Sequence, residues 1–132
     1  MKTFTLPPAP KRWTVREFHR LWDGGYFVDR KPILIDGTIL EQPMPNPPHN
    51  VGVTLADYLL KSIFGIGFVV RVQMTLEIDP FSDPQPDLCV VPGSPRDFAA
   101  NPTTALLVVE VSDTTLAYDR GTKSNLYAAA GV

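Results

Sequence analysis

Two acidic residues lie at the ends of strongly apolar segments, and they are the strongest candidates for a catalytic or metal-binding role. Asp87 opens the apolar segment 88–91, and Glu110 closes the apolar segment 105–109. If the two segments pair as antiparallel strands, the start of one lies beside the end of the other. The two carboxylates would then meet, where they repel and lose hydration unless a cation lies between them. The pattern therefore predicts a divalent-metal site and metal-assisted hydrolysis.

The other reactive or metal-binding residue types in the chain indicate which metal and which reaction are expected. A single cysteine, Cys89, excludes a disulfide framework and argues against a zinc cluster. Hard oxygen ligands favour Mg²⁺, or Mn²⁺, over zinc. Glu41 is a further candidate acid, and Lys123 is the candidate cation that would steady a phosphate or an attacking water.

Each of these residues also has an ordinary structural interpretation. Asp87 follows a proline and is equally compatible with a turn. Glu110 could be paired with an arginine, although its apolar neighbours favour a functional role about two to one. Glu41 is as compatible with a solvated hairpin end as with a site. For Lys123 the ordinary expectation is a solvent-facing lysine.

The predicted last helix carries Asp119, Lys123 and Tyr127 on one stripe, because these positions are four residues apart. Asp119 and Lys123 could form a surface ion pair worth only a few tenths of a kcal/mol. This spacing alone does not decide whether the residues form a surface ion pair or part of a catalytic site.

Three further polar residues have open or minor roles at this level. His49 opens a long predicted helix, where a polar contact at the helix start is slightly favoured over catalysis. Gln73 on a predicted strand is either a buried hydrogen-bonding residue or a site residue. His19, on the first predicted helix, is expected to have no site role.

The elements that must position these residues follow from local patterns. A capping box at Thr14 and Glu17 predicts a helix over 14–22, and Asp36-Gly37 predicts a tight hairpin over 33–41. An apolar repeat every four residues predicts an amphipathic helix over 48–64; its members are Val51, Leu55, Leu59 and Ile63. Strands are expected at 26–28, 87–91 and 105–111, and residues 68–73 and 75–78 are expected to form one strand or a bulged pair. A last helix is expected at 118–130.

This order of helix, hairpin, helix, strands and helix is typical of an α/β fold with helices flanking a sheet. The pattern does not decide whether the strands run parallel or antiparallel. The 132 residues fit one domain, 1–132. No apolar run approaches the roughly 18–20 residues of a membrane span, so no membrane association is expected. The single cysteine is typical of a reducing compartment, so a cytoplasmic location is expected.

The net charge of −2 is not the basic footprint of a domain that coats nucleic acid. It is compatible with a DNA-cutting enzyme whose metal supplies positive charge locally.

Several segments together resemble the Uma2 family of endonucleases, also called the DUF820 group, in the PD-(D/E)XK nuclease superfamily. The similar segments are 34–41, 48–50, 84–88, 108–113, 118–123, 127–128 and 130–131, in the family's order. The resemblance implies a restriction-endonuclease-like fold, a mixed β-sheet core flanked by helices. Family members usually continue into another strand, so the domain is expected to be C-terminally incomplete, without its C-terminal strand or strands.

The resemblance also implies roles for individual residues. It places the metal-binding aspartate on Asp87 and its acidic partner on Glu110, and Glu41 matches an acidic position that would add to the metal site. The superfamily's lysine usually comes two residues after the second acid, where this chain has Ser112. Lys123 on the following helix would replace it.

These observations lead to a hypothesis of a magnesium-dependent endonuclease that hydrolyses DNA as a homodimer. One alternative is a catalytically silent DNA-binding or protein-interaction module that retains the nuclease fold. Another is hydrolysis of a small phosphorylated molecule by the same residues.

Overall fold

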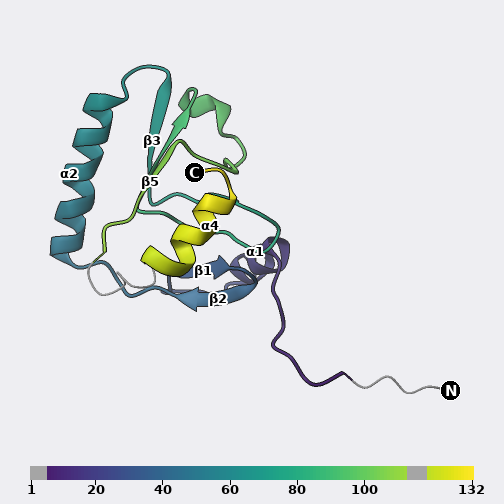
Figure 1. The fold of residues 1–132 in the computed structure, drawn as a ribbon. Coiled ribbons are helices and arrows are strands. Elements are labelled where there is room, and N and C mark those ends of the chain that lie inside the picture. The colour runs from purple at the N-terminus through teal and green to yellow at the C-terminus, as the bar shows by residue number, and fades with distance from the viewer. Residues whose placement is uncertain (1–5, 113–118) are drawn as a thin grey trace.

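The computed structural model describes residues 6–112 and 119–132, and within them it contains three α-helices and two small antiparallel sheets. The helices and strands follow one another as α1 (Val15–Asp23), β1 (Pro32–Ile35), β2 (Thr38–Glu41), α2 (Pro47–Ile63), β3 (Phe68–Val72), β4 (Leu88–Pro92) and β5 (Leu107–Val109). The short 3₁₀ turn η1 (Pro95–Asp97) lies between β4 and β5. The chain ends with the π-helical turn η2 (Asp119–Lys123) and α4 (Ser124–Ala129) (Figure 1). The mixed α/β class expected from the sequence is therefore confirmed.

Helix α1 begins where the capping box predicts. The Glu17 amide donates to the Thr14 hydroxyl oxygen over 3.1 Å, and the Glu17 carboxylate accepts from the Thr14 amide over 3.1 Å. Hydrogen bonds from Lys11 and from the Thr14 amide lower the pKa of Glu17 below its ordinary value. The helix packs Phe18 against Phe27 and Leu34, so it lies on the buried strand β1.

The hairpin of β1 and β2 turns at Asp36-Gly37, as predicted. Both residues have positive φ, 46° and 79°, which is the backbone of a type I′ turn. Ile35 faces Thr38 in the resulting register, and all four residues of β1 are buried. A glycine is required for a second reason, because a Cβ at position 37 would lie 2.1 Å from Cγ of Arg12.

The second sheet has the order β3-β4-β5, with β4 in the middle and both neighbours antiparallel to it. The two faces of β4 enter different core clusters. Leu88 and Val90 pack with α2, whereas Cys89 and Val91 pack with Leu76, Ala105 and Tyr127 of α4. In Figure 1, β3 and β5 accordingly lie between α2 and α4. Burial on both faces explains why β4 is a continuous apolar run rather than an alternating one.

The buried side of helix α2 is not the side that carries the apolar residues of the four-residue repeat. Val53 and Leu60 are buried against β4, with Ala56 and Phe64 packed beside them. The repeat residues, by contrast, are 57–63% exposed; they are Val51, Leu55, Leu59 and Ile63. The helix is apolar on two sides, so the hydrophobic pattern alone does not identify its buried side.

Four expected elements differ from the structure by more than one residue at an end. Residues 26–28 form a turn after α1, because the Tyr26 amide donates to the carbonyl of Leu21. Residues 75–78 do not form a strand, because the chain leaves β3 at Gln73, whose φ is 51°. The strand expected over 105–111 is limited to 107–109. The last helix is a π-helical turn followed by 124–129, and its expected start at Tyr118 lies outside the described residues.

Among the described residues, no helix has both the length and the apolar character needed to cross a bilayer.

Candidate functional site

Asp87 and Glu110 lie side by side at one end of the second sheet. Leu88 of β4 pairs with Val109 of β5, so the residues just outside this pair, Asp87 and Glu110, are neighbours. The Asp87 amide donates to Oε2 of Glu110 over 3.4 Å, and the Val111 amide donates to Oδ2 of Asp87 over 2.8 Å. The antiparallel register thus brings together two acids that are 23 positions apart in sequence.

His49 contacts the same carboxylate from the start of α2. Its Nε2 lies 3.1 Å from Oδ1 of Asp87, and the side chains of His49 and Asp87 are only 17% and 15% exposed. The His49 amide donates to the side chain of Asn46, which caps the helix. His49 therefore makes the helix-start contact that the sequence favoured, through its backbone amide, and its imidazole in addition contacts Asp87.

Two groups from the C-terminal segment reach Glu110. The Tyr127 hydroxyl donates to Oε1 over 2.7 Å, and the Lys123 ammonium lies 3.7 Å from the same oxygen. Lys123 is only 5% exposed, so the ordinary expectation of a solvent-facing lysine is wrong. Lys123 and Tyr127 meet one carboxylate because residues four apart share one side of a helical segment.

The side chains of Asp87, Glu110, His49 and Lys123 line a cavity of about 260 Å³. Its walls come from distant parts of the chain, namely Lys31, the loop 42–46, His49, Gln73, Gln85, Asp87, Glu110, Val111 and Lys123. The cavity therefore combines acidic, basic and amide groups. Such convergent polar groups are typical of a binding or catalytic site.

Gln73 contributes its backbone to this arrangement. Its amide donates to the carbonyl of Asp87 over 3.0 Å, and its positive φ is uncommon for a residue with a side chain. The hydrogen bond to Asp87 helps to hold this conformation. Gln73 is exposed and lines the cavity, so it is not the buried strand residue that one sequence interpretation suggested.

Gly52 lets α2 approach the same end of the sheet. A Cβ at this position would lie 2.9 Å from Cγ1 of Val111, closer than side-chain carbons pack. Val111 is the residue whose amide binds Asp87. The missing side chain in α2 thus allows the helix to lie against the segment that holds the acid.

Glu41 is placed apart from the other acids. Its side chain is 57% exposed and forms an ion pair with Arg30. Glu41 does not line the cavity, although its neighbour Gln42 does. A role for Glu41 as a metal ligand stays a prediction, and it would require Glu41 to exchange Arg30 for the ion. The side chain of Asp119 lies outside the described residues.

The donor set of the cavity fits a hard divalent cation. Asp87 and Glu110 offer carboxylate oxygens from adjacent strand ends, and their side chains are 15% and 12% exposed. Mg²⁺ is commonly bound through one or two carboxylates while it keeps waters and contacts substrate phosphates. Two carboxylates beside an accessible cavity meet that requirement.

Sequence reasoning left His49 undecided and gave Tyr127 no separate role. The signal for Tyr127 was its place on the stripe with Lys123, and the signal for His49 was its place in a segment similar to the family. The contacts of both depend on which strands pair, which no local pattern reveals.

Comparison with known proteins identifies one family. The family model described as "Uma2: Putative restriction endonuclease" matches residues 15–132. No curated protein matches the chain. Together with the mixed α/β architecture, the family match confirms the restriction-endonuclease-like fold expected from the sequence.

Proposed function

Because the chain belongs to the Uma2 family, we propose that it is a magnesium- or manganese-dependent endonuclease that hydrolyses phosphodiester bonds in DNA. The family description supports nuclease activity in general. One observation carries the more specific proposal: the carboxylates of Asp87 and Glu110 converge at a polar cavity that also contains a buried lysine.

Asp87 and Glu110 would hold the ion, and neighbouring groups keep both carboxylates in place. Oδ2 of Asp87 accepts the Val111 amide, and Oδ1 lies beside His49. When bound, a divalent ion stabilises charge on the phosphate and lowers the pKa of a coordinated water. Each hydrogen-bonded carboxylate oxygen still has a lone pair for a second partner.

Lys123 supplies positive charge at the same place. Its ammonium is buried beside Glu110, where a charge acts more strongly than in bulk water. We assign it to the phosphate, whose negative charge rises during hydrolysis. Tyr127 orients Glu110 through its hydroxyl and is therefore a positioning residue rather than a catalytic one.

The charge distribution supports a nucleic acid substrate for the cavity. The chain has a net charge of −2, but Lys31 and Lys123 both line the cavity. A bound divalent ion would add positive charge beside them, where a phosphate must approach. The proposal includes the cytoplasmic location expected from the sequence, where DNA is accessible.

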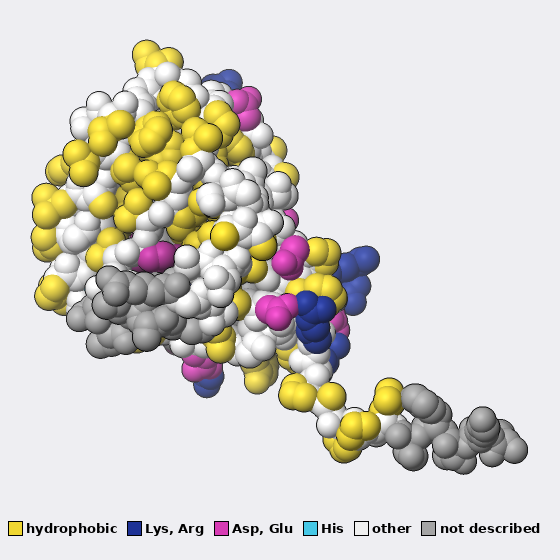
Figure 2. Space-filling view, viewed as in Figure 1, with side chains coloured by type: hydrophobic (Ala, Val, Ile, Leu, Met, Phe, Trp, Pro, Cys, Tyr) yellow, Lys and Arg dark blue, Asp and Glu magenta, His cyan; other side chains and the backbone are white. Residues whose placement is uncertain are grey.

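We extend the proposal to a homodimer, because a cut through both strands of a duplex needs two sites or two events. The exposed apolar residues of α2 support this arrangement. Val51, Leu55, Leu59 and Ile63 are four residues apart and lie on one side of the helix. Figure 2 is drawn in the same view as Figure 1. It shows hydrophobic side chains gathered over the region of α2 and β3. Contiguous exposed apolar surface of this kind is typical of association sites.

The direct test is a plasmid-nicking assay with the Asp87→Ala variant in the presence of Mg²⁺ or Mn²⁺. Loss of a metal ligand should reduce the rate at least about 100-fold, more than the loss of an outer-shell partner costs. Asp23→Asn is the matched control, because it removes an exposed carboxylate that does not line the cavity. Cleavage that persists unchanged in Asp87→Ala would exclude this mechanism. A wild-type protein that binds DNA without cleaving it would instead support the silent module.

A further inference from the structure

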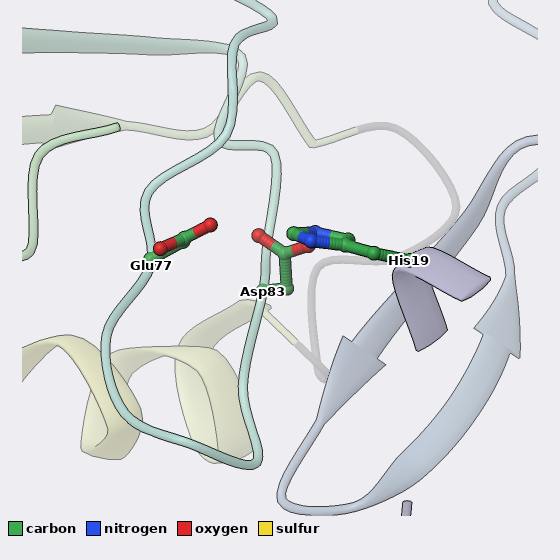
Figure 3. Close-up of side chains that lie close together, drawn as sticks. All are labelled: His19, Glu77 and Asp83. Carbon is green, nitrogen blue, oxygen red and sulfur yellow. The ribbon is translucent and has the colours of Figure 1, made fainter. Parts of the chain in front are cut away.

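A second group of potential metal ligands lies outside the cavity. His19 comes from α1, Glu77 from the segment after β3, and Asp83 from the loop before β4. One ligand atom from each residue lies within 4.8 Å of the other two, and among the described residues no other His, Cys, Asp and Glu side chains form such a group. Figure 3 shows the three side chains turned toward one another, with Asp83 between Glu77 and His19.

Asp83 is the fixed member of this group. It is only 4% exposed, and its amide donates to the carbonyl of Leu34 in β1 over 2.7 Å. Its Oδ2 lies 2.7 Å from Nε2 of His19. The loop is therefore attached to the first sheet, and the carboxylate is held at a defined place beneath α1.

The other oxygen of Asp83 is buried and has no hydrogen-bond partner among the described residues. Figure 3 shows one oxygen beside the imidazole and the other turned toward Glu77. A buried oxygen without a partner is costly, and native proteins usually supply a partner, a water or an ion. This oxygen is the second observation, besides the cluster itself, that points to a missing ligand.

An ion pair between His19 and Asp83 alone leaves two features unexplained. It provides nothing for Oδ1, and it places the negative charge of Glu77 near that of Asp83. Burial raises the pKa of Asp83 and the charge of Glu77 adds to this, whereas His19 lowers it. A cation between the two carboxylates would satisfy the oxygen and remove the repulsion.

We propose that His19, Glu77 and Asp83 form a second metal site, separate from the Asp87 cavity and suited to a zinc-type divalent ion. One imidazole and two carboxylates match the three protein ligands of many zinc sites, with water as the fourth ligand. An imidazole in the set distinguishes it from the oxygen-only pair at Asp87, because nitrogen ligands favour zinc over magnesium.

The distances allow this assignment with small movements. In a tetrahedral site, ligand atoms that bind zinc at about 2.0–2.2 Å lie roughly 3.3–3.6 Å apart, so these side chains would move together by about 1 Å. The ligand atoms already lie within 4.8 Å, and the side chain of His19 is 43% exposed, so it can adjust. The ion would replace the hydrogen between His19 and Asp83, since a metal ligand must be deprotonated at the binding atom.

The site is accessible from solvent. His19 and Glu77 line a surface depression together with Arg16, Arg20 and Asp23, and none of its lining residues belongs to the Asp87 cavity. A bound ion would join α1 to the loop that carries Asp83 and to the segment that carries Glu77. The site would therefore have a structural role, as a clamp between the N-terminal helix and the segment that connects β3 to β4.

Calorimetric titration of the tag-free full chain with Zn²⁺ tests the proposal. The Asp87→Asn/Glu110→Gln double variant should bind one equivalent of Zn²⁺, because it lacks only the ligands of the proposed nuclease site. In that background, Glu77→Gln should weaken binding about tenfold or more. Asp23→Asn should not weaken it, although this residue lines the same depression. Zinc binding at the second site and nuclease activity are therefore measured separately, so a negative result for one proposal leaves the other intact.

The visible absorption of bound Co²⁺ distinguishes metal ligands from residues that only stabilise the fold, because only ligands affect the spectrum directly. Co²⁺ bound by His19 and two carboxylates should give visible bands that His19→Ala abolishes, while circular dichroism verifies the fold of that variant. Glu77→Gln keeps the contact between His19 and Asp83, so it remains informative if His19→Ala unfolds. Absence of Zn²⁺ binding in the double variant, or affinity unaffected by Glu77→Gln, would overturn the proposal.

Discussion

The backbone amide of Asp87 donates to the carboxylate of Glu110, across 3.4 Å, although the two residues are 23 positions apart. The contact exists because β4 and β5 are antiparallel with Leu88 opposite Val109. One acid thus directly precedes the central strand, and the other directly follows the neighbouring strand. The predictions for the proposed nuclease depend on this register.

Glu110→Gln should remove most of the affinity for Mg²⁺ or Mn²⁺ while preserving the fold. The amide has the shape of the carboxylate but carries no charge. Its one oxygen can still accept from the Tyr127 hydroxyl, whereas its NH₂ group replaces the oxygen that accepts the long 3.4 Å bond from the Asp87 amide. Calorimetric titration should show at least about a tenfold loss of affinity. Affinity equal to that of the wild type would mean that Glu110 is not a ligand.

Lys123→Met should reduce nicking about 100-fold, the usual effect of removing one group that stabilises developing charge. It should leave metal affinity unchanged or increased, because the ammonium 3.7 Å from Glu110 competes with a bound ion. Methionine preserves the buried apolar stem. Lys61→Met is the matched control, since Lys61 forms an exposed ion pair with Asp57 on α2. A large loss of metal affinity in Lys123→Met would instead indicate a structural role for the lysine.

Leu55→Glu combined with Leu59→Lys should convert a homodimer to a monomer, because both side chains are exposed on one side of α2. Light scattering after size-exclusion chromatography measures the mass directly. The control is the change Met44→Gln in the exposed loop before α2. A wild-type mass equal to one chain at micromolar concentration would contradict the dimer.

The capping box of α1 should make stability depend on pH. The pKa of Glu17 is lowered in the folded state, first by Lys11 and then by the Thr14 amide. A lowered folded pKa means that the stabilisation is present above the ordinary value of 4.5 and is lost as the pH falls through the folded value. Glu17→Gln should therefore destabilise the protein at pH 7 and have a smaller effect at pH 3, as measured by urea denaturation. An equal effect at both pH values would show that the carboxylate charge does not contribute.

The sequence by itself determined the features that depend on neighbouring residues. The capping box at Thr14, the tight turn at Asp36-Gly37, the apolar segment after Asp87 and the one before Glu110 are all local patterns. Each involves residues a few positions apart, whose energetics hardly depend on the rest of the chain. The family resemblance was also visible, because it depends on the order of short segments.

Only the tertiary structure decided which distant groups meet. The register of β4 and β5 placed Asp87 beside Glu110, and the approach of α2 at Gly52 brought His49 to the same carboxylate. Glu41 instead lies outside the cavity lining and pairs with Arg30. The group of His19, Glu77 and Asp83 was not visible in the sequence, since its members are up to 64 positions apart. Such contacts depend on strand pairing and helix packing, whose free energy is distributed over the whole core rather than encoded in any one segment.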